Sequence, residues 1–435
     1  MRTLTRTTAP TTAPTVGTPG SSLLRRNRDF RLLYTGEVTG QFGSSVTNLA
    51  LPLIATVVLH ADALKVSSLT AAAWLPWLLL GLPAGAWVDR LRRRPVMLAA
   101  AACSLLLYLT IPVAGTLGLL TFPQLLAVAF CAGVSAVFFQ TAYTALLPTL
   151  VAEPDRAEGN AKIQGSASVA QFAGRSSAGA IAQFFGPVNG LFANTVTFLV
   201  SVLCTARIHE AERRTAPADR RSLRQDVGEG LRLVLGDSWL RSILAYGGLS
   251  NLALTAYQSI QVIFLLNRAG LPQGLIGTLI ALSGLGGIAG AAVARRVGTA
   301  IGTARALLLF QLGLPVLALL IPLADRGAGA ACYLVGGLAV SGGVVAGNVL
   351  RATFIQRYVP AEMFGRTSAT TAVVVYGTMP IGALLGGGLA QAFGLGTAMW
   401  LSCAAVPLAA TVLLCSPIRR HRDLPTRPMT AAPTA

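Results

Sequence analysis

Long apolar stretches recur along the chain from about residue 32 to about residue 416, and short polar segments separate them. Each stretch is close to the roughly 20 residues that a helix needs to cross a bilayer. Only helices or closed barrels span lipid, because every backbone polar group must be satisfied internally. Since these Ala, Leu, Val and Gly runs lack the alternation of barrel strands, we predict twelve transmembrane helices, at about 32–59, 66–88, 96–117, 122–148, 163–185, 190–206, 241–267, 272–294, 304–324, 330–351, 367–393 and 396–416.

The composition excludes a soluble protein of this length. The chain has 435 residues, of which 53% are hydrophobic and only 11% are charged, whereas soluble proteins average about 25% charged residues. The six cysteines lie within apolar runs and form no CxxC pair, and the three histidines lie at span ends or in loops. This pattern predicts neither a disulfide framework nor a metal site, and no cofactor. The expected fold class is therefore an all-α membrane protein.

The distribution of basic residues gives the orientation of the spans. When the loops are assigned to alternating sides, 30 of the 34 Lys and Arg residues lie on the side of the chain termini. The other side holds only Lys65, Arg268 and Arg326, and Arg175 falls inside a span. Because cytoplasmic loops are enriched in Lys and Arg, we expect both termini in the cytoplasm of a multi-pass protein of the cell (plasma or inner) membrane. The net charge of +18 is thus a topology signal and does not indicate nucleic-acid binding.

The two halves of the chain resemble one another. The segment Gly85–Arg90 after the second predicted helix matches Gly290–Arg295 after the eighth, at an offset of 205 residues. Two such parallel six-helix repeats are typical of secondary transporters, whose site lies at the midplane between the halves. We therefore expect a disordered N-terminal tail, an N-terminal six-helix bundle, a cytoplasmic linker, a C-terminal six-helix bundle and a cytoplasmic tail, at 1–22, 23–206, 207–240, 241–417 and 418–435.

Several motifs resemble a known family. The segment from Gly85 to Arg94 reads GAWVDRLRRR and is similar to the helix 2–3 signature G-x-x-x-D-R-x-G-R-R of the major facilitator superfamily, with Arg92 in place of the second glycine. Further segments resemble its drug:proton antiporter branch, which contains macrolide-efflux and enterobactin-exporter-like proteins: Asn27–Tyr34, Gln41–Ser44, Leu147-Pro148, Asn160-Ala161, Asn194–Phe198, Gln356–Arg366 and Pro380–Gly387.

The resemblance implies a major facilitator fold with two pseudo-symmetric six-helix bundles. It also implies a gating role for the helix 2–3 motif, as contacts that close the cytoplasmic gate in one state and break in the other. The residues concerned are Gly85, Asp89, Arg90, Arg93 and Arg94. An aspartate next to a helix end accepts backbone N–H bonds and pairs with arginine, which suits that task. The alternative is that these arginines only set the topology.

Glu37 and Arg175 are the two charges inside the predicted spans, and intramembrane charges are functional hypotheses by default. Glu37 begins a stripe with Gln41, Ser44 and Asn48, whose steps of four, three and four place them on one helical face. A carboxylate away from water takes up a proton more readily, so Glu37 is a candidate for proton coupling. The alternative is that Glu37 extends to the cytoplasmic interface.

Arg175 stands where the family's helix 5 motif carries proline, and it aligns with Pro380 of the second repeat at an offset of 205. Three readings stay open for its side chain. It binds an anionic or carbonyl-bearing substrate, it forms a charge pair with Glu37, or it is a structural link between helices. The arginine that the superfamily uses for proton coupling in helix 4 is missing, because residues 122–148 contain no charge.

Other spans carry polar and aromatic stripes. The resemblance implies that helices 1, 4, 7 and 10 line a central cavity, which makes these residues candidates for substrate contact: Gln41, Ser44, Asn48, Trp74, Phe139, Gln140, Tyr143, Asn251, Thr255, Gln258 and Asn348. Ordinary interhelical packing is the alternative for each of them. An apolar cavity with scattered amides and aromatics suits bulky amphipathic molecules.

The expected function is proton-gradient-driven export of an amphipathic small molecule, as in drug or antibiotic efflux, by a protein that works as a monomer. Its partners would be the substrate, protons and the lipid bilayer. ATP is not expected, since no Gly-Lys-Ser/Thr loop occurs. Export of a siderophore or another secondary metabolite is the alternative. An enzyme would need a convergent His or Asp/Glu pair inside the spans, and a non-transport sensor would need an appended domain, so neither is favoured.

Overall fold

The computed structural model describes residues 23–88, 90–151, 155–209 and 223–425, and all regular elements within these ranges are helical. A short helix α1 (Leu23–Arg26) precedes the first six long helices, which we call the N-half. They are α2 (Arg28–Val57), α3 (Ala63–Val88), α4 (Arg93–Thr116), α5 (Phe122–Leu150), α6 (Arg156–Phe185) and α7 (Gly190–Ala206).

The second set of six spans, the C-half, follows helix α8 (Leu223–Gly236). Two of its spans change helix type along their length. Its elements are α9 (Ser238–Ile263) with the π-helical turn η2 (Phe264–Arg268), α10 (Gln273–Ile301), α11 (Thr303–Leu308) with η3 (Leu309–Gly313) and η4 (Leu314–Leu323), α12 (Gly329–Tyr358), α13 (Ala361–Phe393), and α14 (Leu395–Ala409) with α15 (Thr411–Leu414). A 3-10 turn, η5 (Pro417–Arg420), ends the described chain.

The predicted all-α membrane fold is confirmed. Within the described ranges, nine helical segments are long and apolar enough to cross a membrane by length and composition. The other three predicted spans correspond to α2, α6 and α7. Of these, α2 and α6 are 30 residues long but carry more polar side chains, and α7 has 17 residues. Several helices extend past the predicted spans: α12, for example, continues to Tyr358 instead of ending near residue 351.

Helix α8 was not predicted, because the segment 207–240 was read as a polar linker without structure. The helix has one apolar stripe, from which Val234 is buried against the C-half. The chain after the last span is also partly ordered: Ile418 and Leu424 are buried, and the Arg422 carbonyl accepts from the Ala304 amide at 3.1 Å. The predicted disordered tail 1–22 lies outside the described residues.

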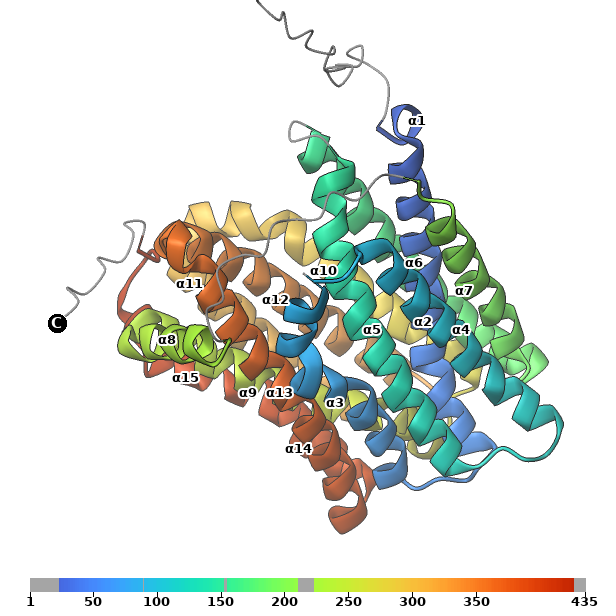
Figure 1. Ribbon diagram of the computed structural model, residues 1–435. Coiled ribbons are helices and arrows are strands. Elements are labelled where there is room, and N and C mark those ends of the chain that lie inside the picture. Colours follow the sequence, from blue (N-terminus) through green and yellow to red (C-terminus); the bar gives the residue numbers. More distant parts are fainter. Residues whose placement is uncertain (1–22, 89, 152–154, 210–222, 426–435) are drawn as a thin grey trace, which may run out of the picture.

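The pairings between helices repeat in the two halves. In the N-half, α2 packs on α6 and α7, α3 packs on α5, and α4 packs on α5 and α7. The C-half shows the equivalent set: α9 packs on α13 and α14, α10 packs on α12, and η4 packs on α12 and α14. Figure 1 shows the two sets as separate groups of helices that meet along one boundary. The chain therefore builds the same six-helix arrangement twice.

The two halves meet mainly where α3 contacts α13 and where α6 contacts α10. Because the twelve spans alternate in direction, the start of α2 and the end of α15 lie on the same side of the bundle, which we call the terminal face. Both α6 and α13 run away from this face, whereas α3 and α10 begin at the opposite face. The tightest contacts between the halves involve Gly179, Gly277 and Gly387, near the opposite-face ends of their helices. We call this set of contacts the closed boundary.

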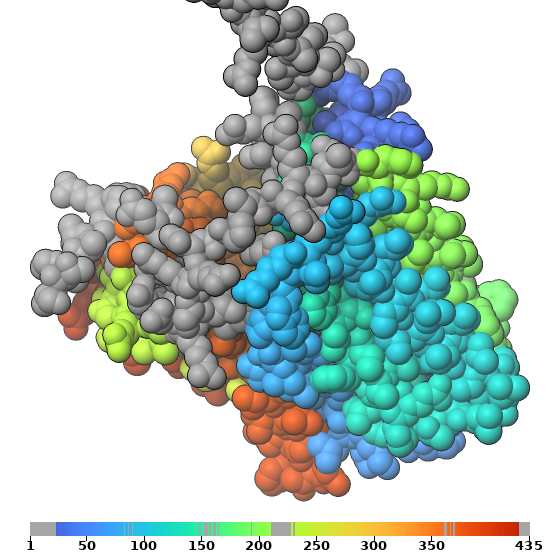
Figure 2. Space-filling view, in the orientation of Figure 1, coloured from blue at the N-terminus to red at the C-terminus, as the bar shows by residue number. Residues whose placement is uncertain are grey.

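The outer surface of the bundle is apolar. Leu106 of α4, for example, is 63% exposed, and α4 and α5 form a large part of the surface that faces the viewer in Figure 2. Side chains of this kind on the outside of a helical bundle are what a lipid environment requires.

Candidate functional site

The N-half holds a buried carboxylate. Glu37 of α2 is only 6% exposed, and the Nε2 atom of Gln41, one turn further along, donates to its Oε1 atom at 2.9 Å. Tyr143 of α5 interacts electrostatically with Glu37 and is 5% exposed. Its hydroxyl has no hydrogen-bond partner among the described residues. The low exposure of Glu37 argues against the alternative in which its side chain reaches the membrane interface.

The predicted polar stripe on α2 becomes more accessible along its length. Gln41 and Ser44 are half-buried, and Asn48 is exposed. On α5, Phe139 stacks on Tyr143 with 6.4 Å between the ring centroids, and Gln140 is half-buried. We refer to Glu37, Gln41 and Tyr143 as the N-half cluster.

The two predicted tryptophan positions on α3 contact the other half of the molecule. Trp74 stacks on Tyr376 of α13 at 6.0 Å between ring centroids, and Trp77 lies 5.0 Å from the same ring. These aromatic side chains therefore extend the contact between the halves toward the middle of α3 and α13. Tyr376 had not been predicted as a site residue, because its contact with α3 depends on how the two halves dock.

The predicted stripe on α9 is only partly accessible. Asn251 is half-buried and donates to the Gly247 carbonyl at 2.9 Å. Thr255 is 4% exposed, and its hydroxyl donates to the Asn251 carbonyl at 2.7 Å. Gln258 is exposed, as is Asn348 of α12. Polar side chains at membrane depth that remain accessible are expected to face water or substrate and not lipid.

A second intramembrane arginine was missed by the sequence reading. Arg351 of α12 is half-buried, its Nη2 atom donates to the Asn348 Oδ1 atom, and its guanidinium carbon lies 4.9 Å from the centre of the Tyr246 ring of α9. It was assigned to a loop because the predicted span ended at residue 351, whereas α12 continues for two more turns. The apolar residues Phe354 and Ile355 were the signal that the span continues.

Arg175 lies on the closed side of the boundary. Its side chain is half-buried and interacts electrostatically with Tyr257 of α9 and Tyr333 of α12. Tyr333 is fully buried and accepts a hydrogen bond from Gln261. Among the described residues no ion pair joins Arg175 to Glu37, so the predicted charge pair is not formed in this structure. Arg175 instead brings an N-half cation to two C-half tyrosines.

The arginines of the helix 2–3 motif bond within their own half. Arg93 donates from Nη1 to the Ala145 carbonyl of α5 at 2.8 Å. Arg94 donates to the carbonyls of Thr205 and Ala206 at the end of α7, where helix carbonyls lack intrahelical partners. Arg90 is exposed, and a Cβ atom at Gly85 would meet nothing within 4 Å. Asp89 lies outside the described residues.

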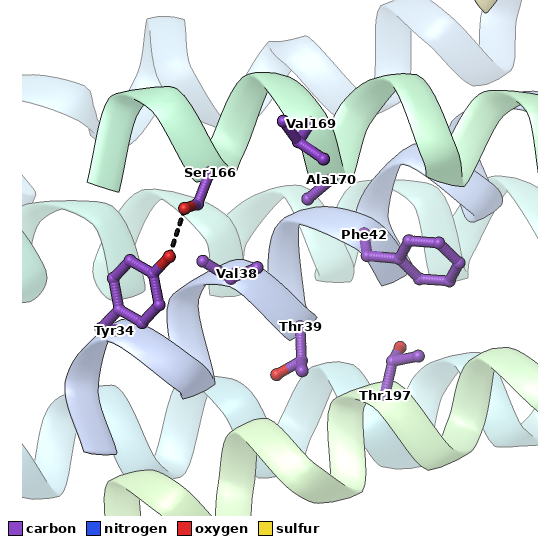
Figure 3. A pocket seen from close by; sticks show the side chains of 8 residues that line it. All are labelled: Tyr34, Val38, Thr39, Phe42, Ser166, Val169, Ala170 and Thr197. Atoms are coloured by element: carbon purple, nitrogen blue, oxygen red, sulfur yellow. Dashed lines mark hydrogen bonds between the residues drawn. The ribbon is translucent and has the colours of Figure 1, made fainter. Parts of the chain in front are cut away.

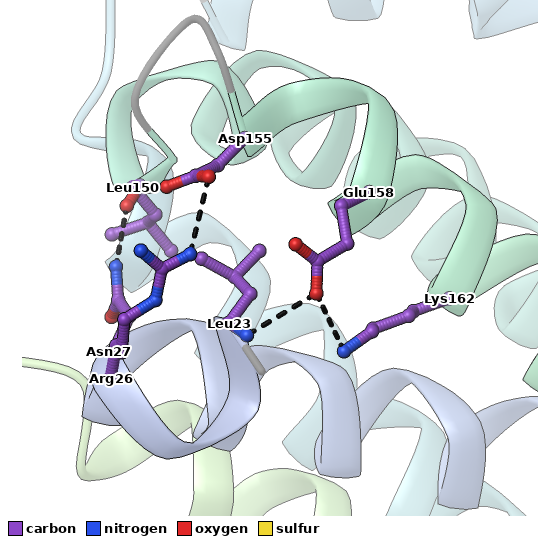
Figure 4. Close-up of polar contacts among 7 residues, drawn as sticks. All are labelled: Leu23, Arg26, Asn27, Leu150, Asp155, Glu158 and Lys162. Atoms are coloured by element: carbon purple, nitrogen blue, oxygen red, sulfur yellow. Dashed lines mark hydrogen bonds and ion pairs between the residues drawn. The ribbon is translucent and has the colours of Figure 1, made fainter. Parts of the chain in front are cut away.

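Helix α1 is attached to the start of α6 by polar contacts (Figure 4). Arg26 forms an ion pair with Asp155 at 3.3 Å, and Glu158 accepts from the Leu23 amide at 3.3 Å. Glu158 also pairs with Lys162 at 2.7 Å, and this hydrogen bond from Lys162 is the main reason that the pKa of Glu158 lies below its ordinary value. We call this set of contacts the α1 latch.

A cavity of about 360 Å³ lies between α2, α6 and α7 (Figure 3). Its lining is mainly apolar, and a hydrogen bond between Tyr34 and Ser166 lies at one end. None of the predicted substrate-contact residues lines it; the full lining is Tyr34, Val38, Thr39, Phe42, Ser166, Val169, Ala170 and Thr197. This cavity is therefore distinct from the polar side chains on α2, α5, α9 and α12. In the described part of the chain, no three His, Cys, Asp or Glu side chains gather as a metal site.

Comparison with known proteins identifies the family. A model of the transmembrane secretion effector family matches residues 21–434. The chain belongs to this family of major facilitator transporters. It is a multi-pass membrane transport protein and not an enzyme. No curated protein matches the chain.

Solved structures of other transporters share this family member's fold. The nucleoside transporter NupG superposes with a TM-score of 0.73 at 9% identity, covering 90% of this chain and 99% of its own. A bacterial homologue of the iron transporter ferroportin, in an inward-facing state, gives 0.72 at 20% identity, covering 91% and 99%. A bacterial homologue of the human lysosomal transporter Spinster, inward-facing and unoccupied, gives 0.65 at 13% identity, covering 91% and 96%. At these identities the likeness establishes the fold, and the predicted antiporter branch stays a prediction.

Proposed function

We propose that this transporter exports an amphipathic small molecule in exchange for protons, with the terminal face in the cytoplasm of the cell membrane. The description of the family as secretion effectors supports the outward direction. The charge distribution supports the orientation, because basic residues concentrate in loops on the side of the termini. Drug or antibiotic efflux is the form of export that the sequence resemblance favours.

The N-half cluster carries the proton-coupling part of the proposal. Glu37 is a buried carboxylate within the described spans, and its partners Gln41 and Tyr143 are neutral. A carboxyl group in such surroundings is stable when protonated and costly when charged without a partner. The unpaired hydroxyl of Tyr143 offers a hydrogen-bond donor to the charged form. Glu37 would thus exchange a proton with whichever side of the membrane the cavity faces.

The second part of the proposal is that transport proceeds by alternating access. The halves are packed tightly at the closed boundary, near the opposite face, so the structure corresponds to a state that opens toward the terminal face. Two of the similar transporters carry the description inward-facing, which agrees with this assignment. In the outward-open state the closed boundary would separate, and the terminal-face ends of the halves would approach one another.

The helix 2–3 motif would then take part in closing the terminal face. Arg93 and Arg94 fix the ends of α5 and α7 to the start of α4, which makes this end of the N-half a rigid unit. Arg90, by contrast, is exposed. We assign Arg90 and Asp89 to the contact with the C-half in the outward-open state, and the exposed or half-buried candidates on α2, α5, α9 and α12 to the substrate cavity between the halves.

A transport assay tests the proposal. Cells that lack their own efflux pumps would be loaded with a panel of amphipathic compounds, with and without a protonophore. We expect gradient-dependent loss of at least one compound, and we expect Glu37→Gln to abolish it. Glu158→Gln, at an exposed carboxylate on the terminal face, is the matched control. Because Glu37→Gln retains the cavity, substrate exchange at equal concentrations should persist. Export that is insensitive to both the gradient and Glu37→Gln would disprove proton coupling.

A further inference from the structure

The C-half holds a cation that no described carboxylate neutralises. The described acidic side chains that form ion pairs are Asp62, Asp155 and Glu158, and none of them contacts Arg351. A charged side chain inside a spanning helix is costly unless it is paired or reaches water, and Arg351 lies seven residues before the end of α12. Contact with an aromatic face recovers part of this cost, because the ring carries negative charge on its face. The remaining hydrogen-bond donors of the guanidinium need a further partner.

The tyrosine beneath Arg351 is held in place by a hydrogen-bond network. The Tyr246 hydroxyl donates to Gln311 of η3 and accepts from Ser250 at 3.2 Å. Gln311 in turn donates to the Gly343 carbonyl of α12 at 3.2 Å. Tyr246 is 2% exposed and Gln311 is 1% exposed. The aromatic platform is therefore preorganised, and Arg351 does not have to order it when a ligand arrives.

Polar side chains that are exposed or half-buried lie beside Arg351 on α12 and one turn from Gly247 on α9. Asn348, one turn away on α12, is exposed and accepts one N–H of Arg351. A Cβ atom at Gly247 of α9 would lie 3.8 Å from the Nη1 atom of Arg351, so the guanidinium lies close to the α9 backbone at a residue without a side chain. Asn251 lies one turn beyond Gly247 and is half-buried. An arginine has five N–H donors in a planar fork that matches an oxyanion in two-point contact.

We propose that Arg351, Asn348 and Asn251 bind the oxyanion group of the exported molecule, so that the substrate is an amphipathic carboxylate or sulfonate. This inference rests on the proposed export function and specifies its substrate class. The C-half binds the anionic group, and the apolar and aromatic walls of the cavity contact the rest of the molecule. The N-half cluster holds a proton-carrying carboxyl, which would repel an anion when charged.

An equilibrium binding assay tests this site without any gradient. The full-length protein in nanodiscs of phosphatidylcholine would be titrated with pyrenebutyrate and naphthaleneacetate, and with the methyl ester of each. We expect the carboxylates to bind at least about tenfold more tightly than the esters, which matches the size of a charge-assisted hydrogen bond. Arg351→Gln should remove this difference, because it weakens carboxylate binding more than ester binding.

Control variants distinguish binding at this site from a general effect of the protein's positive charge on anion affinity. Arg357→Gln, at an exposed arginine on the same helix, should retain the preference for carboxylates. If Arg351→Gln does not fold, as judged by its unliganded Tm, Asn348→Ala should lower carboxylate affinity by about threefold, as the loss of one neutral hydrogen bond would. Absence of a carboxylate preference in the wild type, including absence of binding, overturns the proposal. Survival of the carboxylate preference in the folded Arg351→Gln variant also overturns the proposal, as does an undiminished carboxylate affinity of Asn348→Ala where that variant replaces it.

A second arm distinguishes a soluble anion from a lipid headgroup. In nanodiscs that contain phosphatidylglycerol, carboxylate binding should persist with a similar Kd. If phosphatidylglycerol instead abolishes it in the wild type, the site belongs to an anionic lipid and the proposal is overturned. Because no proton gradient is present, failure here leaves proton-coupled export standing, and failure of the efflux assay leaves the anion site standing.

Discussion

The two ends of the boundary between the halves are built from different chemistry. At the closed boundary small neutral residues bring the helices close together: α6 meets α10 through Gly179 and Gly277, and Ser67 of α3 donates to Ser259 of α9 at 3.3 Å. At the terminal face many of the polar contacts are ionic or charge-assisted and lie within one half, as in the bonds of Arg93 and Arg94.

This difference indicates how each end opens. Close packing of backbone against backbone is lost as a unit when the helices separate by a small distance, since dispersion falls steeply with separation. Charged contacts on a wet surface are individually weak and are exchanged for others at low cost. The closed boundary should therefore respond strongly to added volume and weakly to salt, and the terminal face should show the reverse.

The largest expected effect comes from adding one methyl group to the α6–α10 contact. A Cβ atom at Gly179 would lie 2.6 Å from the Gln273 carbonyl oxygen and 2.9 Å from the Gly277 Cα atom, so Gly179→Ala must push the helices apart. Overpacking of this kind costs about 1–3 kcal/mol. We expect a transport rate at least about tenfold lower, measured as initial efflux at equal protein abundance.

Gly165 provides a matched control on the same helix. A Cβ atom there would meet nothing within 4 Å, and alanine favours a helix over glycine by roughly 1 kcal/mol. Gly165→Ala should therefore retain transport. Equal loss of activity in both variants would show that the α6 backbone, and not the contact with α10, was disturbed.

A somewhat smaller effect is expected on the other side of the closed boundary. A Cβ atom at Gly387 of α13 would lie 2.6 Å from the Cβ atom of Ser67, which belongs to a small side chain on α3. We expect Gly387→Ala to reduce transport several-fold and the double variant with Ser67→Gly to recover part of it, since the Leu64 Cα atom would still lie 3.0 Å from the added Cβ atom. The neighbouring Gly388, with open space around it, supplies the control Gly388→Ala. Failure of Ser67→Gly to rescue would mean that this contact does not limit closure.

The spans followed from the sequence because lipid imposes length and apolarity on each helix separately. Helix ends were less predictable, as α12 shows: its last turns are polar enough to read as a loop, yet they pack through Phe354 and Tyr358. The amphipathic helix α8 was missed for the same reason, since its apolar stripe is short.

Within the candidate site, the helical spacing from Glu37 to Asn48 sufficed to select one face of α2. The Arg351–Tyr246 contact could not be found this way. It joins residues 105 positions apart, and its geometry depends on Gln311 of a third helix. Likewise, the sequence singled out Arg175 but could not show that it interacts electrostatically with Tyr257 and Tyr333. Local sequence patterns predict which residues share one face of a helix. Contacts between residues of different helices can be identified only once the packing of those helices is known.

A moderate effect on stability is expected at the terminal face. Arg94 bonds to the last carbonyls of α7, and a cation at a helix C-terminus contributes about 0.3–1 kcal/mol at low ionic strength. Arg94→Gln should lower the Tm by a few degrees, whereas Arg92→Gln, at an exposed arginine, should not. Because salt screens such interactions, the difference should shrink at high ionic strength. A difference in Tm between the two variants that does not depend on salt would contradict our conclusion that charged contacts stabilise the terminal face.

The smallest expected effect is a pH dependence of the α1 latch. The hydrogen bond from Lys162 lowers the pKa of Glu158 below its ordinary value of 4.5. The charged carboxylate is therefore favoured in the docked state, and its contribution is complete above pH 4.5 and is lost as the pH falls through the lowered pKa. Anisotropy of a fluorescent label at Arg25→Cys, with the native cysteines replaced by serine, should fall at acidic pH as α1 detaches. Glu158→Gln cannot titrate, so its anisotropy should stay constant over this range. An identical acid response in both proteins would assign the effect to other groups, such as the Asp155 partner of Arg26, and would leave the terminal face ionic but not dependent on Glu158.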